Sequence, residues 1–158
     1  MRSAKFVATA LAAALTLALA GCTTVAPRAT GPVQVKVLAI NDFHGNLKPP
    51  QGGVRIRDPQ DASKTVNVAA GGAEHLATAV RELRARNANH IFVAAGDLVG
   101  ATPLLSALFH DEPTIESMNA MGLEASAVGN HEFDKGSAEL LRLQRGGCAS
   151  EGCKGPQT

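Results

Sequence analysis

The chain has 158 residues, of which 45% are hydrophobic and 18% charged, and its formal net charge at pH 7 is +1. This length is usual for one domain, and the apolar share is enough to build a core. A nearly neutral chain has no electrostatic basis for binding nucleic acid or an anionic membrane surface. Only 3% of the residues are aromatic, with no Trp or Tyr, which argues against base stacking and a rich protein-binding surface.

Residues 1–21 are predicted to be a secretory signal peptide. Arg2 and Lys5 give a positive start, residues 6–20 are rich in Ala and Leu, and small residues precede Cys22. The apolar stretch is too short for a comfortable membrane span of about 20 residues. Once Arg2 and Lys5 are removed with this segment, the formal charge of the chain becomes −1.

The string from Leu19 to Cys22 resembles a lipobox. The resemblance implies cleavage before Cys22 and acylation of its thiol and of the new amino terminus, and two or three acyl chains anchor a protein stably. Thr23 stands where inner-membrane lipoproteins often carry Asp, so the outer membrane, facing the periplasm, is the expected location. The alternative is an ordinary signal peptide in which Cys22 is incidental.

Beyond a predicted tether at residues 22–32, the apolar pattern alternates between strand and helix. Residues 33–40 combine alternating Val residues with a continuous apolar run, which predicts a strand entering a buried sheet. Residues 54–68 contain two short runs around a turn and predict a surface hairpin. The remaining elements are expected as helix 72–87, strand 90–95, a short helix capped by Thr102, helix 113–121 ending at Gly122, strand 123–128 and helix 137–145. This order predicts a layered α/β fold.

Each of the three predicted sheet strands is followed by a polar string. The strings are Asn41–Asn46, Gly96–Asp97 and Gly129–Asp134. In layered α/β sheets such strand ends converge at one edge, where ligands bind. Asp, His and Asn without Cys suit divalent metal ions rather than a structural zinc cage, and these residue types do not distinguish Mn, Zn, Fe, Mg or Ca.

The spacing of these residues indicates how each could contact metal. Asp42 and His44 are separated by one residue, so both side chains can turn toward one cation. Asp97 follows Gly96, and its two carboxylate oxygens can bridge two ions. Asn130 offers a neutral carbonyl oxygen.

With their neighbouring residues, at 40–47, 96–102 and 129–136, the strings resemble the first three motifs of the calcineurin-like metallophosphoesterases, specifically the bacterial 5′-nucleotidase branch. The resemblance covers residues 33–145. The resemblance implies a metallophosphoesterase-type sheet with flanking helices and two divalent metal ions. It implies that Asp42 and His44 bind the first ion, that Asp97 bridges both, and that Asn130 binds the second.

The same resemblance makes His131 the catalytic histidine, which would stabilise charge on the scissile phosphate and protonate the leaving oxygen. Asp134 would orient and polarise it, and an imidazolium held by a carboxylate favours a dianionic transition state. A hydroxide bridging the two ions would be the in-line nucleophile. The implied substrate is an extracytoplasmic nucleotide or other phosphomonoester. The sequence does not indicate an oligomeric state.

Members of that family supply further histidines from later strands, in a Gly-His-x-His motif, and then a nucleotide-binding C-terminal domain. Residues 33–158 contain neither, so we expect them to be the N-terminal part of such a hydrolase, inactive alone. The first ion would have three protein ligands and the second only two. The other histidines, His75, His90 and His110, are expected to be solvated.

Other interpretations stay open. The chain could be a non-catalytic exported lipoprotein with a vestigial metal half-site. Cyclic-nucleotide phosphodiesterases and nucleotide-sugar hydrolases share the first three motifs.

Cys148 and Cys153 lie in a Gly-rich loop, and export to an oxidising compartment favours a disulfide between them. A zinc pair is the alternative, although no second Cys or His pair accompanies it.

Overall fold

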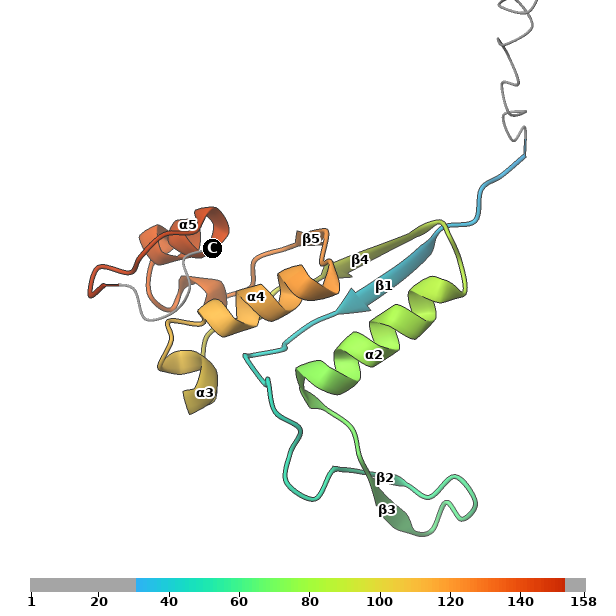
Figure 1. Cartoon of the computed structure of the whole chain (residues 1–158). Helices are drawn as coiled ribbons and strands as arrows, with labels where there is room; N and C mark the ends of the chain where they lie inside the picture. The colour runs from blue at the N-terminus through green and yellow to red at the C-terminus, as the bar shows by residue number, and fades with distance from the viewer. Residues whose placement is uncertain (1–30, 153–158) are drawn as a thin grey trace, which may run out of the picture. The chain divides into compact units, whose positions relative to one another are not determined.

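The computed structural model describes residues 31–152. The predicted signal peptide, Cys22, most of the tether and Cys153 lie outside this part of the chain. Residues 34–152 belong to one compact unit. Its elements, in chain order, are β1 (Lys36–Ile40), β2 (Val54–Arg57), β3 (Thr65–Val68), α2 (Gly72–Ala85), β4 (His90–Ala94), α3 (Leu104–Ala107), α4 (Glu112–Met121), β5 (Ala125–Ser126), the short 3₁₀ helix η1 (His131–Phe133) and α5 (Ser137–Arg145) (Figure 1).

A three-stranded parallel sheet carries the fold, in the order β1-β4-β5. Leu38 of β1 pairs with Phe92 of β4, and Val93 pairs with Ala125 of β5. Because the strands are parallel, the three polar strings leave the sheet at the same edge. The predicted layered α/β arrangement with flanking helices is therefore confirmed.

The predicted surface hairpin is also confirmed. Strands β2 and β3 pair antiparallel, with Val54 opposite Val68 and Arg57 opposite Thr65. Asx turns shape the connection, since Asp58 accepts the backbone N–H of Gln60 at 2.8 Å. The hairpin forms a sheet of its own, separate from β1-β4-β5.

The core lies between the parallel sheet and the helices α2 and α4. Phe92 and Met118 are 0% and 1% exposed, and they pack with the α2 residue Val80. The remaining buried residues of this cluster are Leu38, Ala94, Leu98, Val99 and Met121. Burial of these side chains against one face of the sheet holds the strand ends in place.

The sheet is half-buried rather than buried on both faces, as β1 had been expected to be. Leu38 is buried, whereas its neighbours Val37 and Ala39 are exposed, Val37 by 61%. Among the described residues, α2 and α4 cover only the Leu38 face. The strand also begins later than expected, at Lys36, and Val35 is 59% exposed.

Other boundaries also differ from the predictions: α2 ends at Ala85 rather than at residue 87, β4 ends at Ala94, and α4 begins at Glu112. Pro103 rather than Thr102 occupies the N-cap position of α3, and the Thr102 hydroxyl donates to Asp111. The strand expected at residues 123–128 shortens to the two residues of β5. Pairing nevertheless extends beyond it, since the N–H of Glu124 donates to Phe92 O and that of Ala127 to Ala94 O, both at 2.9 Å.

Arg84 fastens α2 to the end of α4. Its guanidinium donates to the carbonyls of Met121 at 2.8 Å and Gly122 at 2.6 Å, and lies 5.7 Å from the centre of the Phe92 ring. Gly122 has a φ of +72° and ends α4 in the left-handed conformation, as predicted.

No helix among residues 31–152 combines the length and apolar character that crossing a bilayer requires.

Replacing Phe92 by Ala should lower the free energy of unfolding by about 3–5 kcal/mol, because the buried ring leaves a cavity that its neighbours cannot fill. Urea unfolding followed by circular dichroism measures the loss. Val37→Ala, on the exposed face of the neighbouring strand, is the matched control and should change stability by less than about 0.5 kcal/mol. Equal effects of the two substitutions would contradict the placement of the core.

Candidate active site

The loops that follow β1 and β4 continue to pair after the strands end. The N–H of Asp42 donates to Gly96 O at 3.1 Å, and that of His44 to Asp97 O at 3.0 Å. Asp42, His44 and Asp97 have φ values of +52°, +46° and +53°. This left-handed conformation is uncommon outside glycine, though Asp and His adopt it more often than most residues. Such positions are typical of functional sites, where the surrounding structure imposes them.

Glycines in the motifs permit a close approach of the second and third loops. A Cβ atom on Gly129 would lie 2.2 Å from Oδ1 of Asp97, and one on Gly96 would lie 2.5 Å from the backbone nitrogen of Gly129. Neither position can therefore hold a side chain without moving its neighbour. The glycines bring the Asp97 carboxylate against the backbone of the third motif.

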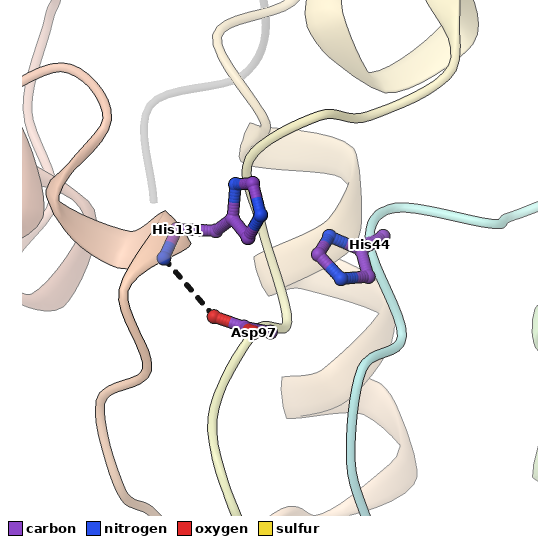
Figure 2. Close-up of side chains that lie close together, drawn as sticks. All are labelled: His44, Asp97 and His131. Atoms are coloured by element: carbon purple, nitrogen blue, oxygen red, sulfur yellow. Dashed lines mark hydrogen bonds between the residues drawn. The ribbon is translucent and has the colours of Figure 1, made fainter.

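Three predicted site residues converge at this edge of the sheet. Figure 2 shows His44 on the loop after β1, Asp97 on the loop after β4 and His131 at the start of η1. One possible ligand atom of each lies within 4.8 Å of those of the other two. The two imidazole rings meet edge to face, with centroids 4.9 Å apart. Two imidazole nitrogens and a carboxylate oxygen are ligand types that divalent cations accept, although the family resemblance gives His131 a proton-transfer role rather than a ligand role.

A backbone carbonyl orients His44. Its Nδ1 lies 2.8 Å from Gly100 O, and since a carbonyl only accepts, Nδ1 carries the proton. In the neutral ring Nε2 is then the unprotonated nitrogen, which is the form of the ring that binds a metal ion. The bond to Gly100 thus fixes both the ring orientation and the tautomer of His44.

His131 is held by two carboxylates. Its backbone N–H donates to Asp97 Oδ1 at 3.0 Å, the contact drawn in Figure 2, and its ring Nδ1 lies 2.8 Å from Asp134 Oδ2. The hydrogen bond to Asp134 raises the pKa of the His131 imidazole above its ordinary value, against an opposing effect of desolvation. The pairing leaves Nε2 as the ring atom through which His131 can exchange a proton with a bound molecule.

Asp42 and Asn130 lie around this group rather than inside it. The Asp42 side chain is 57% exposed, and its Oδ1 is 3.8 Å from Nε2 of His44; its Oδ2 accepts from the amide of Asn41. Asn130 is exposed and immediately precedes η1, next to His131. The assignment of Asp42 and Asn130 as ligands stays a prediction.

Glu132 has a structural role that the residue patterns did not reveal. This residue is 8% exposed, and its carboxylate accepts three backbone N–H groups, from Asp97 at 2.9 Å, Leu98 at 2.8 Å and Gly129 at 2.6 Å. Glu132 thereby joins the loops of the second and third motifs. The signal lies in the Gly-Asn-His-Glu string, of which only Asn130 and His131 received a predicted role.

The other histidines lie apart from the cluster, and one differs from expectation. His90, at the start of β4, has Nδ1 2.8 Å from Asn87 O. His75 is 40% exposed and lines a cavity of about 450 Å³ that also reaches Asp42. His110, expected to be solvated, has a side chain that is only 12% exposed, with Nε2 3.8 Å from the carboxylate of Glu151.

The predicted disulfide falls partly outside the described residues. Cys148 is disulfide-bonded, whereas the structure does not describe Cys153. The pairing of these two residues stays a prediction.

The calcineurin-like phosphoesterase family matches residues 35–150. An uncharacterized protein of Acinetobacter calcoaceticus, encoded in the pqq-V 5′ region, is 47% identical over 149 residues, which cover 90% of this chain and 72% of that protein. The cell wall protein Lmo0130 of Listeria monocytogenes is 38% identical over 78% of this chain and 15% of its own length.

Nucleotidases are also similar to the chain. The NAD 5′-nucleotidase of Haemophilus influenzae is 33% identical over 75% of this chain and 19% of its own length. The structure of the NAD nucleotidase from that organism aligns with a TM-score of 0.60 at 32% identity, covering 70% of this chain and 19% of the other. The chain thus spans most of the Acinetobacter protein but less than a fifth of the Listeria and Haemophilus proteins. These matches confirm the resemblance and the fold that the three motifs implied.

Replacing Glu132 by Gln should lower the free energy of unfolding by about 1–3 kcal/mol, because an amide offers one acceptor oxygen where the carboxylate offers two, and a buried N–H loses its partner. It should also weaken Mn²⁺ binding by displacing Asp97. Thermal unfolding and Mn²⁺ titration by calorimetry measure the two effects. Glu82→Gln, on the exposed side of α2, is the control. Unchanged stability and affinity in Glu132→Gln would contradict the role assigned here.

In the metal-free chain, Asp134→Asn should lower the pKa of His131, because the neutral amide no longer favours the imidazolium. Proton NMR of the ring over a pH series measures the shift. Since the folded-state pKa of His131 is raised, the pair stabilises the fold fully below the unfolded pKa of about 6.5, and the contribution is lost as pH rises through the folded-state pKa. A His131 pKa unaffected by Asp134→Asn would refute the pairing.

Proposed function

The chain belongs to the calcineurin-like phosphoesterase family, and we propose that it acts in the metal-dependent hydrolysis of phosphomonoesters, of the 5′-nucleotidase type, on nucleotides outside the cytoplasm. Members of this family are phosphoric ester hydrolases that use divalent metal ions. The observation that carries the proposal is the convergence of His44, Asp97 and His131 within 4.8 Å. The nucleotidases among the relatives support the choice of substrate class.

The proposed ligands follow from the three loops. His44 and Asp97 would hold a first ion together with Asp42, whose carboxylate lies beside His44. Asp97 and Asn130 would hold a second. When bound, two such ions activate water and stabilise the charge of a phosphoryl group. The described residues thus give the first ion three ligands and the second only two.

The protein's own acid–base group in this proposal is His131. Asp134 engages Nδ1 and raises the pKa of the imidazole, so Nε2 carries a proton over a wider pH range than in an isolated histidine. A proton at Nε2 can stabilise negative charge on the phosphate and pass to the leaving oxygen. Asp134 acts by orienting His131 and by favouring its charged form.

The proposed location is outside the cytoplasm. The lipobox-like string supports lipid anchoring at Cys22, with residues 22–32 as a tether and the outer membrane as the site of attachment. The similarity to a cell wall protein supports an extracytoplasmic location. An exported nucleotidase would meet nucleotides released around the cell.

The test is Mn²⁺ binding and hydrolysis of 5′-AMP by the full chain. We expect one Mn²⁺ to bind at least tenfold more tightly than the second, because the second position has two oxygen ligands. Phosphate release should stay near background while only the first position is filled, which is the inactivity expected of these residues alone, and it should rise only where excess Mn²⁺ also fills the second position. His131→Ala should abolish that rise.

His90→Ala is the matched control, because His90 lies at the opposite end of β4 and should leave Mn²⁺ binding and phosphate release unchanged. Phosphate release that is independent of Mn²⁺, or equal in the His131→Ala variant, would overturn the proposal. Tight Mn²⁺ binding without hydrolysis at any concentration would instead support the alternative of a non-catalytic lipoprotein with a vestigial half-site.

A further inference from the structure

A buried acidic side chain outside the three motifs connects the segments around the site. Asp111, between α3 and α4, is 3% exposed. Its Oδ1 accepts from the hydroxyls of Thr102 at 2.6 Å and Ser106 at 2.9 Å, and its Oδ2 accepts from Lys135 Nζ at 3.2 Å. One carboxylate therefore holds the loop after β4, the helix α3 and the segment after η1.

The first of these connections leads to His44. Thr102 lies two residues after Gly100, whose carbonyl accepts the Nδ1 proton of His44. The loop of the first motif also packs on this segment, because a Cβ atom on Gly45 would lie 2.6 Å from Cγ2 of Thr102 and 2.9 Å from Cβ of Ser106. Moving Thr102 would therefore move the acceptor that fixes the His44 ring.

The second connection leads to His131. Lys135 directly follows Asp134, which engages Nδ1 of His131 at 2.8 Å. The two connections also contact each other, because a Cβ atom on Gly100 would lie 2.8 Å from Oδ2 of Asp134 and 2.6 Å from His131 O. A side chain at Gly100 would therefore have no room, which shows that the segment around Gly100 lies against His131 and Asp134.

We propose that Asp111 is a positioning residue that sets the orientation of both site histidines, His44 through Thr102 and Gly100, and His131 through Lys135 and Asp134. This inference rests on the proposed function, because His44 and His131 are the histidines of the proposed site. Positioning groups beyond the metal ligands change metal affinity about 10- to 100-fold in other proteins when they are removed.

A gain in folding stability does not readily explain why a carboxylate is buried at position 111. A buried ionised carboxylate loses its hydration, and buried charge networks often stabilise a fold no more than apolar residues of similar size would. Asp111 also has a φ of +64°, a conformation that glycine adopts without strain. What the carboxylate provides is a fixed geometry among three segments that meet beneath the site, with Ser106 extending it to Thr114 of α4 at 2.7 Å.

The experiment records long-range ¹H–¹⁵N NMR spectra of the histidine rings in the full, metal-free chain at one fixed pH. Asp111→Gly removes the carboxylate but keeps the backbone conformation, and it should shift the Nδ1 signals of both His44 and His131. Thr102→Val should shift mainly the His44 signal, and Lys135→Met mainly that of His131.

Arg84→Met is the matched control, because Arg84 holds the other end of α4. It should lower the unfolding temperature without moving either histidine signal. If Asp111→Gly fails to fold, Thr102→Val and Lys135→Met still decide the matter. Histidine signals that stay in place in both of these variants would overturn the proposal, even if their unfolding temperatures fall.

A Mn²⁺ titration separates this inference from the proposed function. Asp111→Gly should weaken Mn²⁺ binding about tenfold or more, while Arg84→Met should not. If the unmodified chain binds no Mn²⁺, the proposed function fails, whereas the ring spectra of the metal-free variants still test whether Asp111 orients the histidines.

Discussion

The three backbone hydrogen bonds that Glu132 accepts are the constraint on which the site depends. They draw the loop after β4 and the loop after β5 onto one carboxylate, and this places Asp97 within reach of the His131 backbone. A charged acceptor binds N–H groups more strongly than a neutral one. The residue that joins the loops is thus itself part of the third motif, so the motif supplies both the reactive groups and the means of holding them.

The strand and helix order was predictable because α2 carries a clear apolar stripe and β4 is a continuous apolar run, and the core forms where these two elements meet. The extent and burial of β1 and β5 were predicted less well. Both are edge strands among the described residues. Val37 is apolar and yet exposed, so an apolar residue type does not by itself show that its face of the sheet is covered. Burial depends on what packs against a face, which periodicity within one strand cannot reveal.

The convergence of His44, Asp97 and His131 was predictable from three strings that each follow a strand. The contacts that orient these residues were not. The acceptor of His44 is the Gly100 carbonyl, a backbone group that no residue pattern marks, and Asp111 lies in a segment without any recognised motif. Hydrogen bonds between segments far apart in sequence depend on loop geometry, and single-sequence patterns carry little information about it.

The left-handed backbone at Asp42, His44 and Asp97 restricts which substitutions can report on chemistry there. Asn keeps the favoured backbone and removes the charge, so it isolates the electrostatic contribution of an aspartate. Glu keeps the charge but gives up the local hydrogen bonding through which a short side chain tolerates this conformation. Replacing one of these aspartates by Glu therefore changes the backbone strain and the ligand chemistry together, although it is the substitution that looks most conservative.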